Sequence, residues 1–253
     1  MVYKPSRRLK RLCVCLPLAL IAVGLLMPLL GYDAWQKYMM SERWGLAENG
    51  TVAFLLAGII LAGMAISRRG AYPRGLTVFL ALFMLASFYF AGEEASWGQH
   101  WIGFKTPDSI SKMNKQHEFN LHNLQGARKY FNAEPKRLLV VAIVIGGMAA
   151  PLVLIRWRRQ ISEKLAFADW IIPPPIFAVA ATLAICSDFP EEILDDRFHL
   201  SKTFPKTSYL NMALLAPAEE FREFMIAMLF FLYALLIYCR TRQQTPQAQL
   251  RAT

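Results

Sequence analysis

Cysteine and histidine are both scarce in this sequence, with four of each among 253 residues. The cysteines are Cys13, Cys15, Cys186 and Cys239. Their spacing matches neither a metal site nor a disulfide framework, so we expect no intrachain disulfide. The Rossmann fingerprint, the P-loop and the nucleophile elbow are also absent, which removes the usual sequence signatures of nucleotide-binding proteins and α/β-hydrolases.

Charged residues are few as well, at 18% of the chain, whereas hydrophobic residues make up 55%, above the usual share in a soluble domain. A net charge of +10 would ordinarily suggest nucleic acid as a partner. The basic residues, however, flank apolar runs instead of alternating with aromatic residues. We therefore attribute the charge to membrane topology and expect membrane lipids, not nucleic acid, as partners.

Long uncharged runs recur along the chain, each near the roughly 20 residues that cross a bilayer. Five of them are Leu12–Tyr32, Asn49–Ser67, Gly75–Gly92, Leu138–Ile155 and Trp170–Ser187. The first follows a basic N-terminus, as in a signal peptide, but it is longer than a signal core and no small-x-small cleavage site follows it. We therefore expect it to be a retained transmembrane helix.

Two of the runs are irregular. The prolines at 173–175 predict a broken or late-starting fifth helix, because proline removes a backbone donor. A sixth run, Phe224–Cys239, is short and crosses only if its helix extends back through Ala213–Ala218. That extension places four charged residues inside the last helix: Glu219, Glu220, Arg222 and Glu223.

These runs predict an all-α fold, a polytopic membrane helical bundle of about six transmembrane helices with short interfacial helices on the outer side. Residues 1–242 form one transmembrane domain with outer-face segments 93–137 and 188–211, and residues 243–253 form a disordered cytoplasmic tail. Lys and Arg are dense beside the helix ends that share a side with the N-terminus, which predicts that both termini are cytoplasmic.

The stretch Gly92–Asn123 follows the third run and is the richest in chemistry. It opens with the adjacent carboxylates Glu93 and Glu94 and holds three of the four histidines. If the third helix continues beyond them, Glu93, Ser96 and His100 share one helical face.

The same stretch predicts two further helices. Thr106-Pro107-Asp108 is typical of a helix start, with Thr106 as N-cap and proline at the first helical position. A second short helix would place Glu118 and His122 on one face, four residues apart.

From these positions we predict a pocket that opens on the outer side and is lined by carboxylates and histidines. The candidate catalytic residues are Glu93, Glu94, Glu219 and Glu220. The candidate substrate-binding or structural ion-pair residues are Arg222, Glu223, Ser96 and Asn123. The candidate metal ligands are His100, Glu118, His122 and His199, the residue types that hold zinc or a similar divalent metal. His199 could share the metal with Asp195 or Asp196, the alternative being a solvated helix face.

One motif in this stretch carries a resemblance. Its residues are Gly92-Glu93-Glu94, Ser96-Trp97-Gly98-Gln99, Gly103-Phe104, Thr106-Pro107, Asn114, Gln116, Glu118 and Asn120–Asn123. The pattern resembles a family of uncharacterised bacterial multi-pass membrane proteins. The resemblance implies a bacterial inner membrane and a site that faces the periplasm, and it implies no particular activity.

Two other likenesses are weaker. Glu219-Glu220 with Arg222 is similar to the glutamate pair of intramembrane prenyl-type proteases, but the arginine spacing differs and all four histidines precede Glu219. His117 and His122 suggest a membrane di-iron enzyme, for which the chain has too few histidines. We carry neither activity over.

Two function classes remain open. The first is a metal-assisted hydrolase or transferase that acts on a lipid or lipid-linked substrate. The second is a proton- or cation-coupled transporter or a membrane assembly factor that uses the same carboxylates. A purely structural alternative makes the charged residues a network in which Arg222 pairs with Glu219 and the outer loop is ordered by hydrogen bonds. Metal content of the purified protein distinguishes the two functional classes.

Overall fold

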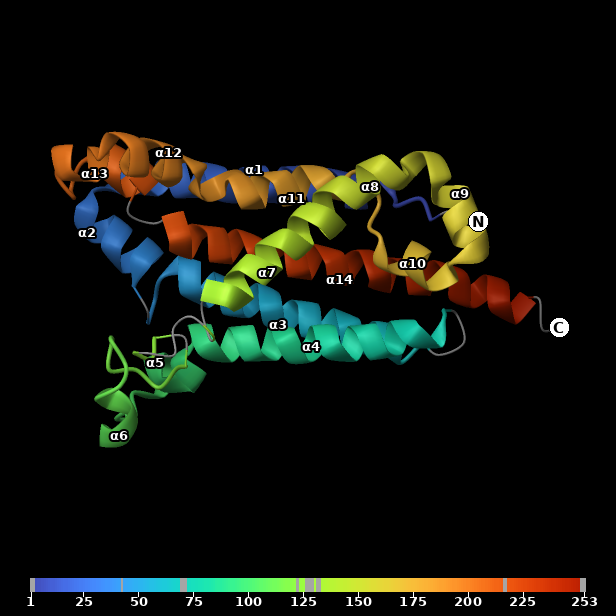
Figure 1. Cartoon of the computed structure of the whole chain (residues 1–253), viewed down its shortest axis with the longest axis horizontal. Coiled ribbons are helices and arrows are strands. Elements are labelled where there is room, and N and C mark those ends of the chain that lie inside the picture. The colour runs from blue at the N-terminus through green and yellow to red at the C-terminus, as the bar shows by residue number, and fades with distance from the viewer. Residues whose placement is uncertain are drawn as a thin grey trace.

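The structure is a computed structural model that describes residues 3–41, 43–68, 72–121, 123–125, 130, 133–215 and 218–250. Helices make up most of these residues, and no strand occurs among them. Figure 1 shows the long helices lying side by side along one axis. The all-α membrane bundle predicted from the sequence is confirmed.

Five helical stretches in the described residues are long and apolar enough to cross a membrane. They are α1 (Arg7–Leu26) with the 3₁₀ turn Met27–Leu30, α3 (Leu46–Ile66), α4 (Arg74–Glu94), the composite helix Glu134–Trp157, and the apolar part of α14 (Ala218–Leu250). The composite helix joins α7 (Glu134–Ala142), a π-helical segment (Ile143–Ala149), α8 (Ala150–Val153) and a 3₁₀ turn (Leu154–Trp157). Each stretch overlaps a predicted run, because apolar length is a local property of the sequence.

The predicted run Trp170–Ser187 is not among these five stretches, and its helix is interrupted at the prolines. Helix α10 (Ala166–Ile171) ends before Pro173, and α11 (Phe177–Ile185) begins after Pro175. From there α11, a 3₁₀ turn (Cys186–Asp188) and α12 (Phe189–Phe198) follow one another, although the apolar part, Phe177–Asp188, is shorter than the other spans. Figure 1 shows α11 and α12 running beside α1 toward the end of the bundle opposite the termini.

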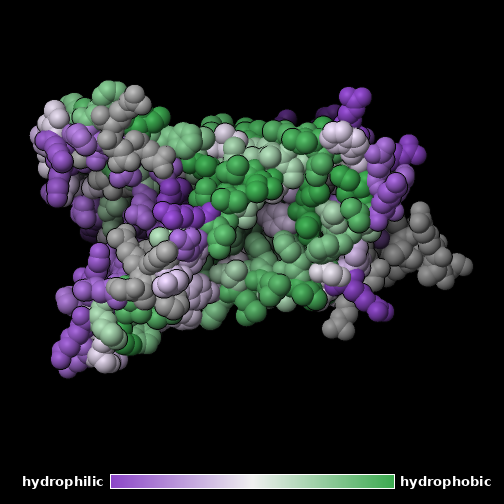
Figure 2. Space-filling model, in the orientation of Figure 1, coloured by the Kyte–Doolittle hydropathy of each residue, from purple (hydrophilic) through white to green (hydrophobic). Residues whose placement is uncertain are grey.

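Short helices cap the two ends of the bundle. One end, called the outer end below, carries α2 (Tyr32–Trp35), α5 (Gln99–Ile102), α6 (Asp108–Ser111) and α13 (Leu200–Thr203). The opposite, inner end carries α9 (Arg158–Lys164), α10 and both chain termini (Figure 1). Figure 2 shows hydrophilic residues gathered at both ends and a hydrophobic belt between them, as a bilayer requires.

Helix α14 lies at the centre of the bundle. In its spanning window 67% of the residues are buried, against 17% to 33% in the other four spans. Helix α3 packs closely against it because Gly50 has no side chain: a Cβ at that position would meet the ring of Phe224 at 2.3 Å. Helix α14 continues to Leu250, beyond Gln243, where the sequence predicts a disordered tail. A helix already nucleated by a span extends at little cost.

The orientation of the bundle remains a prediction that labelling can test. In a cysteine-free background, single cysteines at positions 115 and 202 should react with an impermeant reagent added outside, because both lie at the outer end. A cysteine at position 158 should react only after permeabilisation, and so should one at position 69, which lies outside the described residues. Outside labelling at position 158 would overturn the orientation.

Candidate functional site

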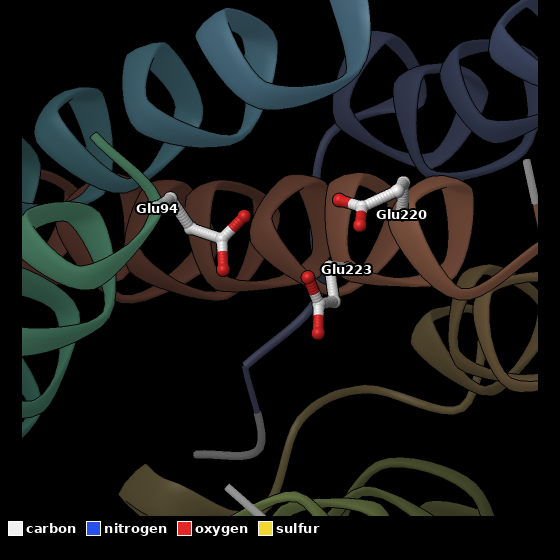
Figure 3. Close-up of side chains that lie close together, drawn as sticks. All are labelled: Glu94, Glu220 and Glu223. Carbon is white, nitrogen blue, oxygen red and sulfur yellow. The ribbon is translucent and has the colours of Figure 1, made fainter. Parts of the chain in front are cut away.

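Three glutamates from two helices converge near the outer end of the bundle. Glu94 is the last residue of α4, and Glu220 and Glu223 lie one turn apart on α14. A carboxylate oxygen of each lies within 4.8 Å of the others, and Glu223 is 6% exposed. Figure 3 shows the three carboxyl groups turned toward a common space. We call these three residues the carboxylate cluster.

The cluster adjoins a cavity of about 240 Å³ between α4, α7 and α14. Glu94 and Glu223 line it, together with Glu93 and the basic residues Lys136 and Arg222. Its other walls are apolar or aromatic: Ala86, Tyr89, Phe90, Pro135, Leu139, Val140, Ile226 and Phe230. The cavity therefore has a charged end and an apolar body, as a site for an amphiphilic molecule requires.

Lys136, in the first turn of α7, brings a positive charge to the cluster. Its ammonium group forms an ion pair with Glu223 and lies 2.7 Å from Glu219. By contrast, no described residue donates a hydrogen bond to the carboxylate of Glu94 or Glu220. Among the described residues, four carboxylates thus gather around one lysine, and those of Glu94 and Glu220 accept no hydrogen bond there.

Arg222 has a different partner from the one expected in the structural alternative. Its guanidinium pairs with Asp188, the last residue of the 3₁₀ turn that follows α11, and not with Glu219. Arg222 contacts the 3₁₀ turn that follows α11, whereas Glu219 contacts Lys136 of α7. The expected pairing of Arg222 is thus present, but with an acid of another helix.

Glu93 binds the outer segment instead of joining the cluster. It is 4% exposed. Its Oε1 accepts a hydrogen bond from the Trp97 indole at 2.8 Å, and its Oε2 accepts one from the backbone N–H of Leu121 at 2.7 Å. The two adjacent glutamates therefore point into different surroundings, one into the outer segment and one into the cavity.

Helix α4 does not continue past Glu94, contrary to the arrangement considered above. The chain turns sharply, with positive φ angles at Ser96 (43°), Trp97 (52°) and Gly98 (91°). Positive φ angles are unfavourable for residues other than glycine, and they persist only where surrounding contacts stabilise them. Ser96 is fully buried, and its hydroxyl donates to Glu118 and accepts from Asn120, both at 3.0 Å. These hydrogen bonds stabilise the turn with its positive φ angles.

The two helices predicted in the outer segment are corrected. Helix α6 begins at Asp108 with Pro107, not Thr106, as N-cap, because the Thr106 hydroxyl instead accepts a hydrogen bond from Gln99 at 2.7 Å. Residues 118–121 and 123–125 are not helical. Hydrogen bonds from the Asn114 side chain order this stretch in place of a helix. The side chain donates to Asn120 and accepts from the backbone N–H groups of Gln116 and Glu118.

His100 links this segment to the membrane bundle. Its ring lies 3.4 Å from Glu48, at the start of α3, and 3.3 Å from Glu118. Burial by itself would lower the pKa of His100, but hydrogen bonds with the two carboxylates outweigh it and raise that pKa to about 10. Burial likewise would raise the pKa of Glu118, yet the bond to His100 lowers it below its usual value. The pair is therefore ionised at neutral pH.

The pKa shifts of His100 and Glu118 predict the pH range in which their ion pair stabilises the protein. The stability from His100 is complete below pH 6.5 and is lost as the pH rises through about 10. The stability from Glu118 is present above pH 4.5 and is lost as the pH falls below that value. The difference in melting temperature between the protein and its His100→Gln variant should therefore be largest between about pH 4.5 and 6.5. A difference that grows toward pH 10 would contradict the pairing.

The remaining sequence candidates are dispersed. His199 is exposed, has a left-handed backbone (φ 52°), and bonds Asp195 through backbone atoms. Asn123 donates to Gln116 within the outer segment. His122 lies outside the described residues. Of the predicted metal ligands, the structure brings together His100 and Glu118; His100 also contacts Glu48, and Glu118 also accepts hydrogen bonds from Ser96 and Asn120.

Three functional neighbours were missed from the sequence: Glu48, Lys136 and Asp188. Each is a charged residue at or near the end of an apolar run. That position was the available signal, because a charge beside a span needs a partner when the helix packs against others. Which partner it takes depends on helix packing, which the sequence pattern does not contain.

The chain matches no protein-family model, no curated protein and no solved structure. The resemblance to the multi-pass family therefore stays a prediction that depends on the motif alone.

Proposed function

We propose that this protein is a membrane enzyme that hydrolyses or transfers a group on a lipid or lipid-linked substrate, with a divalent cation held by Glu94, Glu220 and Glu223. The observation that carries the proposal is the convergence of these three carboxylates at the charged end of an otherwise apolar cavity. In a bilayer, molecules with one polar end and one apolar end are the ones that match such a cavity.

The donor set favours particular cations. All three candidate ligands offer carboxylate oxygens, which suit Mg²⁺, Mn²⁺ or Ca²⁺ better than the zinc suggested by the histidines in the sequence. A cation would also relieve the repulsion among carboxylates that have only Lys136 as a positive neighbour in the described part of the cluster. It would act on the substrate as a Lewis acid and lower the pKa of a bound water.

Each neighbouring residue has a role in this proposal. Glu220 or Glu94 accepts a proton from the attacking water as general base. Lys136 holds Glu223 in place and offers positive charge to an anionic substrate group. The outer segment, held by Glu93 and His100, orders the chain that follows α4 and so fixes Glu94. In the proposed orientation this site faces the periplasm of a bacterial inner membrane.

Metal binding tests the proposal directly. Titration of metal-stripped protein in detergent with Mn²⁺, followed by electron paramagnetic resonance, should show about one bound ion per chain. The Glu220→Gln variant should bind at least about tenfold more weakly, because it loses one of three charged ligands. Glu134→Gln, an exposed carboxylate at the same end that pairs with Arg137, is the matched control and should bind as the parent does. Equal binding by both variants would refute the site.

The second candidate, coupled transport, is favoured by one observation. Glu220 and Glu223 lie within a spanning helix, where ionisable groups often bind transported protons or cations. Proteoliposomes distinguish the two functions. An ion flux that Glu220→Gln abolishes, with no product formed from a lipid phosphate, would favour transport.

A further inference from the structure

A second cavity continues the first one toward the inner end of the bundle. It holds about 310 Å³ and is lined by residues of α4, the composite helix, α11 and α14. Leu139 and Phe230 line both cavities, so the two adjoin, and we treat them together as one groove. The walls of its inner part are apolar except for Tyr233, whose hydroxyl donates to the carbonyl of Ile171 at 2.7 Å.

The groove has a definite length along α14. Glu223 marks its charged end and Tyr233 its far end, ten residues later on α14, which corresponds to about 15 Å of helix. One helix, α14, forms the floor, with Phe79 and Phe83 of α4 on one side and the π-helical segment on the other. The groove thus has an apolar wall on each side of α14.

The groove faces the hydrophobic belt of the bundle. Figure 2 shows this face hollowed between the composite helix and α4, within the belt. Gly146 lines the groove, and a Cβ built there would meet no atom within 4 Å. The chain of a lipid can therefore enter sideways from the bilayer without passing through water.

We infer that the groove binds a hydrocarbon chain of a lipid phosphate, with the phosphate at the carboxylate cluster. This inference rests on the proposed function, because a phosphate approaches the carboxylates only through a bridging cation. Charge complementarity supports the assignment: the cation, Lys136 and the nearby Arg222 are the positive groups at the head end of the groove. Only a hydrocarbon chain matches the apolar length behind them.

A photo-crosslinking experiment tests the inference on the full chain in lipid nanodiscs. The probe is a long-chain monoalkyl phosphate with a diazirine at the chain end, added with Mn²⁺. Mass spectrometry should locate the adduct on peptides that contain Phe79, Phe83 or Tyr233. Gly146→Phe fills the groove and should lower labelling by about tenfold, the effect of overpacking a filled site. Ala149→Phe, an exposed position on the same π-helical segment, is the control and should label as the parent does.

Each alternative outcome is decisive. Equal labelling of the Gly146→Phe and Ala149→Phe variants would overturn the groove as the site. Mn²⁺ binding measured on the same samples separates this inference from the proposed function. Retained Mn²⁺ binding with labelling elsewhere refutes only the groove, whereas groove labelling without Mn²⁺ binding refutes the metal enzyme and the phosphate end of this inference.

Discussion

Replacement of Glu220 or Glu94 by glutamine is expected to lower activity by about two to four orders of magnitude, the usual contribution of a general base. Both side chains should tolerate the change structurally, because neither accepts a hydrogen bond from a described residue. Glutamine keeps the shape and removes the negative charge that the cation and the proton transfer require. The melting temperature should therefore stay near that of the parent protein.

Release of inorganic phosphate from a long-chain alkyl phosphate in proteoliposomes measures this loss, and complementation of a deletion strain measures it in cells. Glu134→Gln, at the same end of the bundle, is the matched control and should keep full activity. Glu93→Gln should behave differently, since Glu93 holds Trp97 and Leu121, and its loss should lower the melting temperature. Full activity in both Glu220→Gln and Glu94→Gln would exclude the carboxylate cluster as the catalytic site.

The largest effect on stability is expected at the opposite end, where Asp169 of α10 pairs with Arg240 of α14. The two residues are 2% and 5% exposed, and the guanidinium also bonds the Asp169 carbonyl at 2.7 Å and lies 4.0 Å from the centre of the Trp170 ring. Removing one member of such a buried pair leaves an uncompensated charge and costs about 3–5 kcal/mol. Asp169→Leu should lower the free energy of unfolding by that amount.

Two comparisons make this prediction specific. The exposed pair of Arg159 and Glu163, at 3.1 Å, is the matched control, and Glu163→Gln should cost about 0.3–0.5 kcal/mol. The double variant Asp169→Leu/Arg240→Met should recover most of the loss, because no unpaired charge remains in it. Thermal unfolding in detergent measures all three. If Asp169→Leu and Glu163→Gln unfolded at the same temperature, the buried pair would not stabilise the fold.

The spans were predictable because they depend on apolar length, which each stretch carries within itself. The predicted run Asn49–Ser67 corresponds to α3 at Leu46–Ile66, and the four charged residues predicted inside the last helix lie in α14. The prolines at 173–175 likewise act locally, and the fifth helix starts after them as predicted.

The site was predictable only in part, because it depends on contacts between helices. Glu94 and Glu220 were identified from their similar depth at the outer end, and the structure brings them together with Glu223. The partners of the charged residues could not be predicted, because Lys136 reaches Glu223 only where α7 crosses α14. Helical periodicity failed between Glu94 and Asn123, where side-chain hydrogen bonds to the backbone replace regular structure.

The turn after Glu94 changes what the motif of this chain identifies. Gly98 and Gly103 have φ angles of 91° and 76°, which only glycine adopts readily, so these two residues of the motif are required by the backbone conformation. The polar residues of the motif form hydrogen bonds within the outer segment and do not line the cavity: Ser96 with Glu118, Asn114 with Asn120, and Gln99 with the backbone of Phe119. A sequence search with this motif would therefore retrieve chains that share a folded loop. To retrieve chains that share the proposed reaction, the pattern needs Glu94 combined with a distant Glu-x-x-Glu in the final helix.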